Sequence, residues 1–253
     1  MRSPIPTVDA HGHLRIGVRF PYKTEPRDMI AVMDSLNIEF VAVTASLACW
    51  NDARSGNEQV DQLLRQHGKR FRGYVTVNPH VPGEAIAEVE RWRHFHTPPL
   101  IKLHPSVQQY AVDGPKYLPV WDYANQTGAV VLVHTWESHP HCGPLLFPKL
   151  ARAHPKASIL LGHSGVTWRG YEQAMEAAAN ISNLYLELSG SQRHRSMLER
   201  CVHRIGAERI VFGSDMPALE AASTLADVLT AAIGDAEKEA ILRHNFLRLL
   251  GEA

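Results

Sequence analysis

The 253-residue sequence has few cysteines, no excess of charge of either sign and no long apolar run. Its three cysteines, Cys49, Cys142 and Cys201, are odd in number and far apart, and no CxxC motif occurs. This spacing indicates neither a disulfide framework nor a thiolate zinc site, and it predicts a reducing, cytoplasmic setting. No stretch approaches the roughly 20 apolar residues that span a bilayer, and the amino-terminal residues lack the apolar core of a signal peptide.

The charge balance excludes further classes of partner. Lys and Arg number 26, Asp and Glu number 26, and the formal net charge is therefore zero. Without a positive excess, the electrostatic drive for nonspecific binding to nucleic acid or to an anionic membrane is missing, so we expect neither partner. What the sequence has in quantity is histidine, with 15 residues. Imidazole is the commonest metal ligand in proteins, which points to a metal site and a small-molecule substrate.

Short apolar, β-branched runs alternate with amphipathic segments along the whole chain. The apolar runs predict eight strands, at Thr7–Leu14, Glu39–Ser46, Arg72–Val77, Leu100–His104, Ala129–Thr135, Ser158–His163, Leu184–Ser189 and Arg209–Gly213. The amphipathic segments predict helices at Pro26–Leu36, Glu58–His67, Gly83–Phe95, Leu118–Gln126, Leu145–Ala153, Tyr171–Ala179, Met197–Ile205, Ala221–Ile233 and Asp235–Leu250.

Eight strand–helix units in about 250 residues predict an α/β protein of one domain over residues 1–253, a (β/α)8 TIM-type barrel with a C-terminal closing helix. An open doubly wound sheet is the alternative, but it would usually carry a Gly-rich phosphate loop after its first strand, where this chain has His-Gly-His. We expect left-handed helix ends at Gly68, Gly128, Gly206 and Gly234, and a functional loop at Ala48–Asn57.

The first predicted strand carries two histidines where a barrel places its active site. Because side chains alternate along a strand, His11 and His13 should point the same way, with Asp9 behind them. Two imidazoles on one inward face can chelate a metal ion. The alternative is a pair of interior histidines that are hydrogen-bonded to their neighbours.

Three later strands end in the same kind of side chain. The fifth strand ends at His134, the sixth at His163 and the eighth at Asp215. A single buried histidine is more often a hydrogen-bonded core residue, whereas a carboxylate after so apolar a strand must be paired or bound to a cation. Because the carboxyl ends of all strands meet at one face of a barrel, we favour a common metal site.

Five motifs, taken together and in order, carry a resemblance to a known family. They are VDAHGHL, IKLHP, LVHTW, LGHSG and FGSDMP. In this order they resemble the amidohydrolase superfamily, and within it the amidohydrolase-2 group, which includes aminocarboxymuconate-semialdehyde decarboxylase and other metal-dependent hydrolases and decarboxylases. The resemblance extends over nearly the whole chain and is specific for the superfamily, although not for the substrate.

The resemblance implies a role for each matching residue. His11, His13 and His134 would bind the metal, and Asp215 would complete the ligand set and orient or deprotonate a bound water. His163 would contact that water or the substrate as a second catalytic residue. Three imidazoles and one carboxylate suit one divalent ion, which we expect to be Zn²⁺, with Mn²⁺ or Fe²⁺ as alternatives.

The fourth strand distinguishes subgroups of the superfamily. Binuclear relatives carry a carboxylated lysine or a glutamate there, and this chain has Lys102 and His104. We read Lys102 as an uncarboxylated lysine that binds a substrate anion, with His104 on the same face as a further substrate-binding residue. A binuclear site bridged by carboxylated Lys102 is the alternative. The TatD-type nucleases have a glutamate at this strand, so its absence counts against a DNase.

Loops after the strands supply the remaining candidates. Trp136 could form a wall of a pocket for a small organic substrate, and Arg169 could pair with a substrate carboxylate, although packing within the loops would explain both. A homodimer is the default for such barrels.

The sequence therefore predicts a metal-dependent hydrolase that cleaves an amide, lactone or ester through a metal-activated water. The alternative is a non-oxidative decarboxylase of a small aromatic or unsaturated carboxylic acid at the same site. The short chain of 253 residues favours the hydrolase, because decarboxylases of this group tend to be longer. A barrel that keeps its metal only for stability is the non-enzymatic reading.

Overall fold

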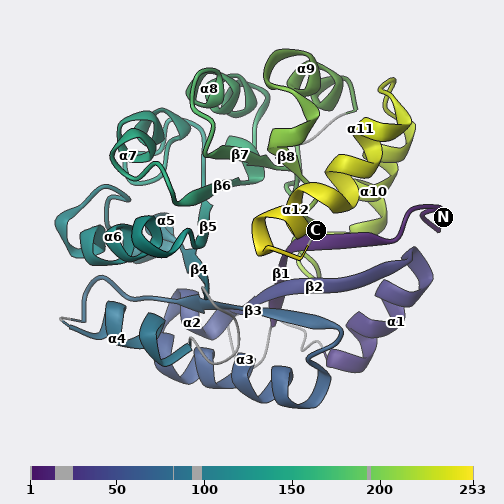
Figure 1. Ribbon diagram of the computed structural model, residues 1–253. Coiled ribbons are helices and arrows are strands. Elements are labelled where there is room, and N and C mark those ends of the chain that lie inside the picture. The colour runs from purple at the N-terminus through teal and green to yellow at the C-terminus, as the bar shows by residue number, and fades with distance from the viewer. Residues whose placement is uncertain (1, 15–24, 82, 93–98, 193–194, 253) are drawn as a thin grey trace.

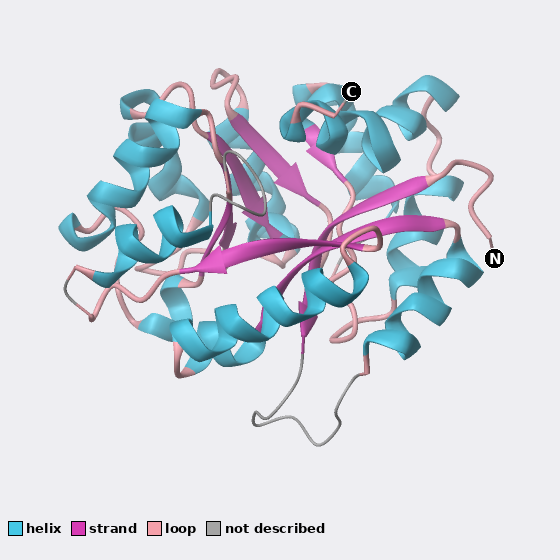
Figure 2. Ribbon diagram, turned by 60° about the horizontal axis from the view of Figure 1, so that its bottom comes forward, coloured by secondary structure: helices cyan, strands magenta, loops and turns pink. Residues whose placement is uncertain are grey.

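The computed structural model describes residues 2–14, 25–81, 83–92, 99–192 and 195–252. Strands and helices alternate through these ranges, and the helices lie outside the strands (Figures 1 and 2). The strands are β1 (Thr7–Leu14), β2 (Ile38–Ala45), β3 (Phe71–Thr76), β4 (Leu100–Leu103), β5 (Val130–His134), β6 (Ser158–Gly162), β7 (Leu184–Glu187) and β8 (Ile210–Val211).

All strand pairs are parallel, and the strands follow one another around the sheet in chain order. The sheet closes where the segment after β8 meets β1: the amide of Ala10 donates to the carbonyl of Phe212 at 3.0 Å, and Gly12 forms a bridge with Met216. The predicted single-domain TIM-type barrel is confirmed, and the alternative of an open sheet is wrong.

The helices cover the outside of the barrel. They are α1 (Pro26–Leu36), α2 (Ser46–Trp50), α3 (Ala53–His67), α4 (Glu84–Arg91), α5 (Pro105–Gln108), α6 (Leu118–Thr127), α7 (Phe147–Ala153), α8 (Trp168–Ala178), α9 (Arg195–Ile205), α10 (Ala221–Thr230), α11 (Asp235–Glu239) and α12 (Asn245–Leu250). The π-helical segment η6 (Ala240–His244) joins α11 to α12, so the predicted closing helix is present. No helix of the described ranges has the length and apolarity needed to cross a membrane.

Two local expectations are wrong, and part of a third cannot be compared with the structure. The predicted loop at Ala48–Asn57 is mostly helical, because the carboxylate of Asp52 caps the amide of Ser55 and starts α3 five residues before the predicted Glu58. Among the glycines, Gly128 and Gly206 have positive φ, but Gly68 ends α3 in right-handed geometry and Gly234 precedes α11 in extended geometry. Residues 93–95 of the helix predicted over Gly83–Phe95 lie outside the described residues.

The core consists of two apolar parts. The larger one fills the space between the strands and the surrounding helices. The smaller one draws buried side chains from all eight strands, so it fills the inside of the barrel; we call it the base layer, and it comprises Val8, Ala10, Phe40, Ala42, Tyr74, Leu100, Val130, Leu132, Leu160, Tyr185, Val211, Phe246 and Leu247. Phe246 and Leu247 belong to α12, which lies across this end of the barrel (Figure 1). The other end is thus the one left for chemistry.

Candidate metal centre at the barrel mouth

A layer of buried polar side chains lies directly above the base layer. Since side chains alternate along a strand, residues two positions beyond the base layer also point inward. We call this set the mouth layer; on β2, β3, β4, β5 and β7 it consists of Thr44, Thr76, Lys102, His134 and Glu187. All lie at the carboxyl ends of their strands, where TIM barrels carry their active sites.

β1 reaches the same level by an irregularity rather than by simple alternation. Val8 and Ala10 belong to the base layer, so unbroken alternation would turn His11 and His13 outward. The register between β1 and β2 shifts between Asp9 and Gly12, and both imidazoles consequently enter the mouth, with ring centroids 5.2 Å apart. The expectation that Asp9 lies behind them on one regular face is therefore wrong.

Asp215 meets both imidazoles from the segment after β8. Its Oδ1 lies 3.0 Å from Nε2 of His13 and 3.8 Å from Nε2 of His11. Its amide donates to the carbonyl of His11 at 2.8 Å, and its φ of 61° is left-handed, a conformation that aspartate tolerates better than most residues. The backbone thus holds the carboxylate against β1.

Asp9 clamps the two segments that carry these ligands. Its Oδ1 accepts from the amides of His11 and Ser214 at 3.0 Å each, and its Oδ2 accepts from the hydroxyl of Ser214 at 2.6 Å. Burial raises the pKa of Asp9 to about 7, although the hydrogen bonds from Ser214 and His11 act in the opposite direction. Asp9 therefore joins the segment that carries His11 to the segment that carries Asp215.

Glu187 lies on the other side of His11 and is fully buried. Its Oε2 accepts from Nδ1 of His11 at 2.9 Å, from the amide of His163 at 2.9 Å and from the hydroxyl of Ser189 at 2.8 Å. Its Oε1 accepts from the amide of Ser189 at 2.7 Å. Any side chain at Gly213 would collide with this carboxylate, because a Cβ there would lie 1.9 Å from Oε1.

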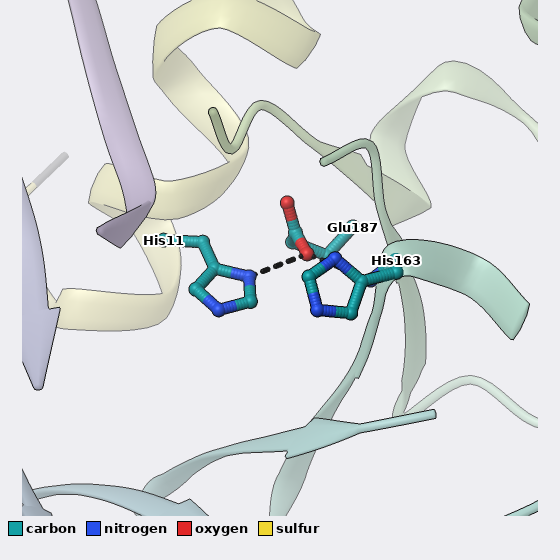
Figure 3. Close-up of side chains that lie close together, drawn as sticks. All are labelled: His11, His163 and Glu187. Carbon is teal, nitrogen blue, oxygen red and sulfur yellow. Dashed lines mark hydrogen bonds and ion pairs between the residues drawn. The ribbon is translucent and has the colours of Figure 1, made fainter. Parts of the chain in front are cut away.

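His163 enters the site from a tight turn after β6. It begins the 3-10 segment η4 (His163–Gly165) and has a φ of 64°, which is unusual for a residue that is not glycine. The turn is held by the hydroxyl of Thr135, which donates to Gly162 at 2.7 Å and accepts from Gly165 at 2.8 Å. The His163 ring lies 4.8 Å from that of His11, measured between centroids (Figure 3).

Lys102 is the one cation of the mouth layer, and its side chain is fully buried. Its Nζ lies 2.8 Å from Nε2 of His11. An amine nitrogen donates a hydrogen bond there, so this ring nitrogen presents a lone pair to the site. Burial lowers the pKa of Lys102, while the charges of Asp215 and Glu187 act to raise it.

Aromatic rings line the side of the mouth next to β4 and β5. The rings of His104 and His134 are stacked, with centroids 4.1 Å apart and planes at 15°. Trp50 lies 6.3 Å from His104, Trp136 lies 6.3 Å from His134, and both indoles are partly exposed. Such a wall suits a flat, unsaturated ligand.

Burial disfavours the charged form of four imidazoles, those of His11, His104, His134 and His163. It lowers the pKa of His163 to about 4 and holds the pKa values of His104 and His134 well below their usual range. The two carboxylates stay ionised: burial raises their pKa values, but neighbouring histidines outweigh it and bring Glu187 to about 2 and Asp215 far below its usual range. Both carboxylates thus stay charged in the mouth, where they favour the charged form of Lys102.

The donor set fits a divalent ion. Nε2 of His11, Nε2 of His13 and a carboxylate oxygen of Asp215 form one set of ligand atoms within 4.8 Å of one another. His11, His163 and Glu187 form a second, but Glu187 already accepts hydrogen bonds at both oxygens. The first set combines neutral imidazole with an ionised carboxylate, the chemistry of Zn²⁺ and Mn²⁺ sites, and a lysine nitrogen already lies against it.

The structure brings together most, but not all, of the residues predicted for the site. His11, His13, His163, Asp215 and Lys102 form one cluster. His134 lies beside it, 4.7 Å from His163 between ring centroids, but belongs to neither set of mutually close ligand atoms in the described ranges.

Arg169 lies farther out. Its exposed guanidinium is 3.6 Å from Glu137, at the start of α8. Its contact with a substrate stays a prediction, as does that of Trp136.

Other residues of the mouth received no role from the sequence. Ser189 connects Glu187 with His163, since its hydroxyl lies 2.7 Å from Nδ1 of His163. The hydroxyls of Thr44 and Thr76 lie 2.6 Å apart, next to buried Cys49. The spacing along the strands could have indicated these residues. Thr44 and Thr76 lie two positions after a residue of the base layer, and Ser189 lies two positions after Glu187.

Comparison with known proteins identifies the family of the chain. The family model described as Amidohydrolase, of the amidohydrolase-2 group, matches residues 8–251. A comparison with curated proteins finds no relative.

Several solved structures share the fold. The 2,6-dihydroxybenzoate decarboxylase from Rhizobium is 18% identical, with a TM-score of 0.78 and 99% of both chains covered. The 5-carboxyvanillate decarboxylase from Sphingomonas paucimobilis is 16% identical, with a TM-score of 0.74 and 98% of this chain and 99% of that chain covered. A dihydroxybenzoic acid decarboxylase from Polaromonas sp. JS666, with bound manganese and the inhibitor 2-nitroresorcinol, is 17% identical, with a TM-score of 0.77 and 98% and 97% covered.

Proposed function

We propose that this chain, which belongs to the amidohydrolase family, is a metal-dependent decarboxylase of a small aromatic or unsaturated carboxylic acid. The observation that carries the proposal is the meeting of His11, His13 and Asp215 beside the buried amine of Lys102. This arrangement offers a cation site and an anion site side by side, which is what a substrate with a carboxylate needs. The similar solved structures named above are decarboxylases, which supports this reaction over hydrolysis.

The proposed reaction needs residues that hold the metal ion. His11, His13 and Asp215 would hold the ion, and His134 stays our candidate for a further ligand. A bound divalent ion supplies positive charge that holds an oxygen of the substrate and stabilises negative charge as it develops. The neighbouring structure with manganese makes Mn²⁺ a candidate beside Zn²⁺.

Lys102 and the aromatic wall would bind the substrate. The ammonium of Lys102 would pair with the carboxylate group, and the rings of His104, His134 and Trp136 would face the plane of the unsaturated carbon skeleton.

A proton must reach that carbon as the bond to the carboxylate breaks. The electron pair of the broken carbon–carbon bond stays on the substrate carbon, CO₂ leaves, and one proton replaces it. Asp215 is ionised and His163 is neutral, so the proton comes from a hydroxyl group of the substrate or from a water molecule. Oδ1 of Asp215 and the ring of His163 are basic groups of the mouth, and we assign to them the transfer of that proton to the carbon.

Hydrolysis of an amide, lactone or ester is the second candidate, because the family is described as Amidohydrolase and the same donor set would serve it. Chain length does not favour hydrolysis, since the match with the Rhizobium decarboxylase covers 99% of each chain.

The test is an assay of the purified protein with Mn²⁺ or Zn²⁺ against two panels. One panel contains hydroxybenzoates and muconate semialdehydes and is followed by CO₂ release; the other contains lactones, esters and amides. We expect CO₂ release that a chelator abolishes and the metal restores. Turnover of the second panel alone would support hydrolysis, and full activity after chelation would refute both. Inertness towards both panels with the metal bound would favour a metal kept only for stability.

A further inference from the structure

The buried carboxylate of Glu187 contacts two imidazoles of the mouth at once, one directly and one through Ser189. The direct contact is with Nδ1 of His11 at 2.9 Å, and the indirect one runs from Oε2 of Glu187 through the hydroxyl of Ser189 to Nδ1 of His163. Figure 3 shows the two rings side by side next to the carboxylate. Each contact restricts where the proton of the ring can lie.

The contact with His11 fixes its tautomer. Oε2 of Glu187 also accepts from the amide of His163, which can only donate, so this oxygen acts as an acceptor. Nδ1 of His11 must then carry the hydrogen, and Nε2 keeps its lone pair. The amine of Lys102, 2.8 Å from Nε2, donates to that lone pair and is consistent with this assignment.

The contact through Ser189 does the same for His163. A serine hydroxyl has one hydrogen, and here it is donated to Oε2 of Glu187 at 2.8 Å. Towards Nδ1 of His163, at 2.7 Å, the hydroxyl can therefore only accept. Nδ1 of His163 carries the hydrogen, and its Nε2 also keeps a lone pair.

Both unprotonated nitrogens point the same way. In Figure 3 the second nitrogen of each ring lies on the side of the ring away from Glu187. For His11 this is the nitrogen that faces Asp215 and Lys102. The space for this arrangement depends on Gly213, since a Cβ there would lie 1.9 Å from Glu187 and 2.9 Å from Cβ of His11.

We propose that Glu187 is a positioning residue that fixes the Nδ1–H tautomer of His11 directly and that of His163 through Ser189, so that both Nε2 lone pairs face the metal and substrate site. The inference rests on the proposed metal site but not on which reaction takes place there. A carboxylate behind a metal-binding imidazole fixes the orientation of the ring and makes it a stronger ligand. Here one carboxylate would prepare both a ligand and a proton-accepting residue.

The test uses the metal-free protein with ¹⁵N-labelled histidine, because the shifts of the two ring nitrogens report the tautomer without any substrate. The signals are assigned with His11→Asn and His163→Asn. We expect Nδ1–H for both residues in the wild type. In Ser189→Ala, His163 should become a mixture of tautomers. His11 should keep its Nδ1–H tautomer, because its direct bond to Glu187 remains, although the Ser189 hydroxyl also lies 3.1 Å from its Nδ1. In Glu187→Gln, both should change.

Metal affinity supplies a second readout. Mn²⁺ binding, followed by electron paramagnetic resonance, should weaken about 10–100-fold in Glu187→Gln. It should change less in Ser189→Ala than in Glu187→Gln, because Ser189→Ala keeps the direct bond between Glu187 and His11. The matched control is Glu88→Gln: this second buried glutamate bonds to Asn57 and Arg91, outside the mouth, and its replacement should leave tautomers and Mn²⁺ affinity unchanged.

Nε2–H tautomers in the wild type would overturn the proposal, and so would unchanged tautomers and Mn²⁺ affinity in Glu187→Gln. If Glu187→Gln fails to fold, the spectra of the wild type and of Ser189→Ala still decide. None of these readouts depends on decarboxylation, so the proposed reaction can fail while this inference holds, and the reverse is equally detectable.

Discussion

The inside of the barrel contains two layers that differ in chemistry although the same strands build them. The base layer is apolar and is covered by Phe246 and Leu247 of α12. Two positions further along, β4 changes from Leu100 to Lys102, and β7 changes from Tyr185 to Glu187. A single step of the strand period thus separates a hydrophobic core from a cluster of ionisable groups.

The difference teaches how the fold separates stability from chemistry. Buried apolar side chains stabilise the barrel by roughly 25 cal/mol per Å² of surface removed from water. Buried ionisable groups cost free energy unless they are paired, so the polar layer is kept in place by its hydrogen bonds and by the scaffold beneath it. Substitutions in the two layers should therefore affect different measurements.

The largest effect on activity should come from Asp215→Asn in the mouth. Asparagine tolerates the left-handed backbone of this position, so the fold should persist, but the ionised ligand and proton carrier is lost. We expect turnover to fall at least about 10²–10⁴-fold, with reduced metal content, in an assay of CO₂ release. Unchanged turnover would show that Asp215 does not act at this site.

The largest effect on stability should come from Phe246→Ala in the base layer. This side chain is fully buried, and its truncation should lower the free energy of unfolding by about 3–5 kcal/mol, measured by urea denaturation. The metal content per folded chain should remain that of the wild type. Leu249→Ala provides the matched control, because Leu249 lies on the same helix but is only partly buried and should cost less. A change of metal content in Phe246→Ala would show that the base layer and the mouth are not independent.

Lys102→Met should make the protein more stable but a poorer enzyme. The buried ammonium of Lys102 contacts a ring nitrogen and, within the described ranges, no carboxylate, so its removal should raise the free energy of unfolding of the metal-free protein by about 1 kcal/mol or more. Loss of the charged partner of the substrate should raise KM about 10–100-fold, the equivalent of one hydrogen bond to a charged group. A gain in stability with unchanged KM would remove Lys102 from substrate binding.

The smallest effect should be a change in pH dependence from His104→Gln. Burial keeps the pKa of His104 well below 6.5, and Lys102 with the imidazoles of His13, His163 and His11 adds to the shift. The unfolded chain takes up a proton below pH 6.5 that the folded chain refuses, so the stabilising contribution is complete above pH 6.5 and is lost as the pH falls.

In the wild type, His104 makes unfolding take up about one proton between pH 6.5 and 5, which adds about 1.4 kcal/mol per pH unit to the slope of the unfolding free energy. His104→Gln should remove this contribution. The measurement uses chelator-treated protein, so that metal release does not contribute. Leu249→Ala, which packs against the base layer, should keep the slope of the wild type. A slope in His104→Gln equal to that of the wild type would show that the mouth does not hold this imidazole neutral.

The alternation of the sequence was sufficient to predict the barrel. The predicted first strand has the observed bounds, Thr7–Leu14, because apolar β-branched residues fill the strands of a parallel sheet and stop where the polar ends begin. The helix at Ser46–Trp50 was missed because its five residues carry no amphipathic period, and Asp52 starts the next helix directly after it. In such short segments, local capping rather than a periodic pattern determines where a helix begins.

The candidate site was predictable only in part. Its histidines and Asp215 follow from their positions at strand ends, whereas the register shift between Asp9 and Gly12 that turns His11 and His13 inward leaves no mark in the sequence. The role of Glu187 depends on contacts with residues 176 and 24 positions away in the chain, and these contacts exist only once the barrel has closed.

The most direct test of this account is a crystal structure of the protein with Mn²⁺, read from anomalous scattering at the manganese edge. The account predicts an ion at the barrel mouth, within about 2.0–2.3 Å of Nε2 of His11, Nε2 of His13 and an oxygen of Asp215, with Lys102 moved away from His11. A mouth without an anomalous peak in protein saturated with Mn²⁺, or an ion bound only at the surface, would contradict it.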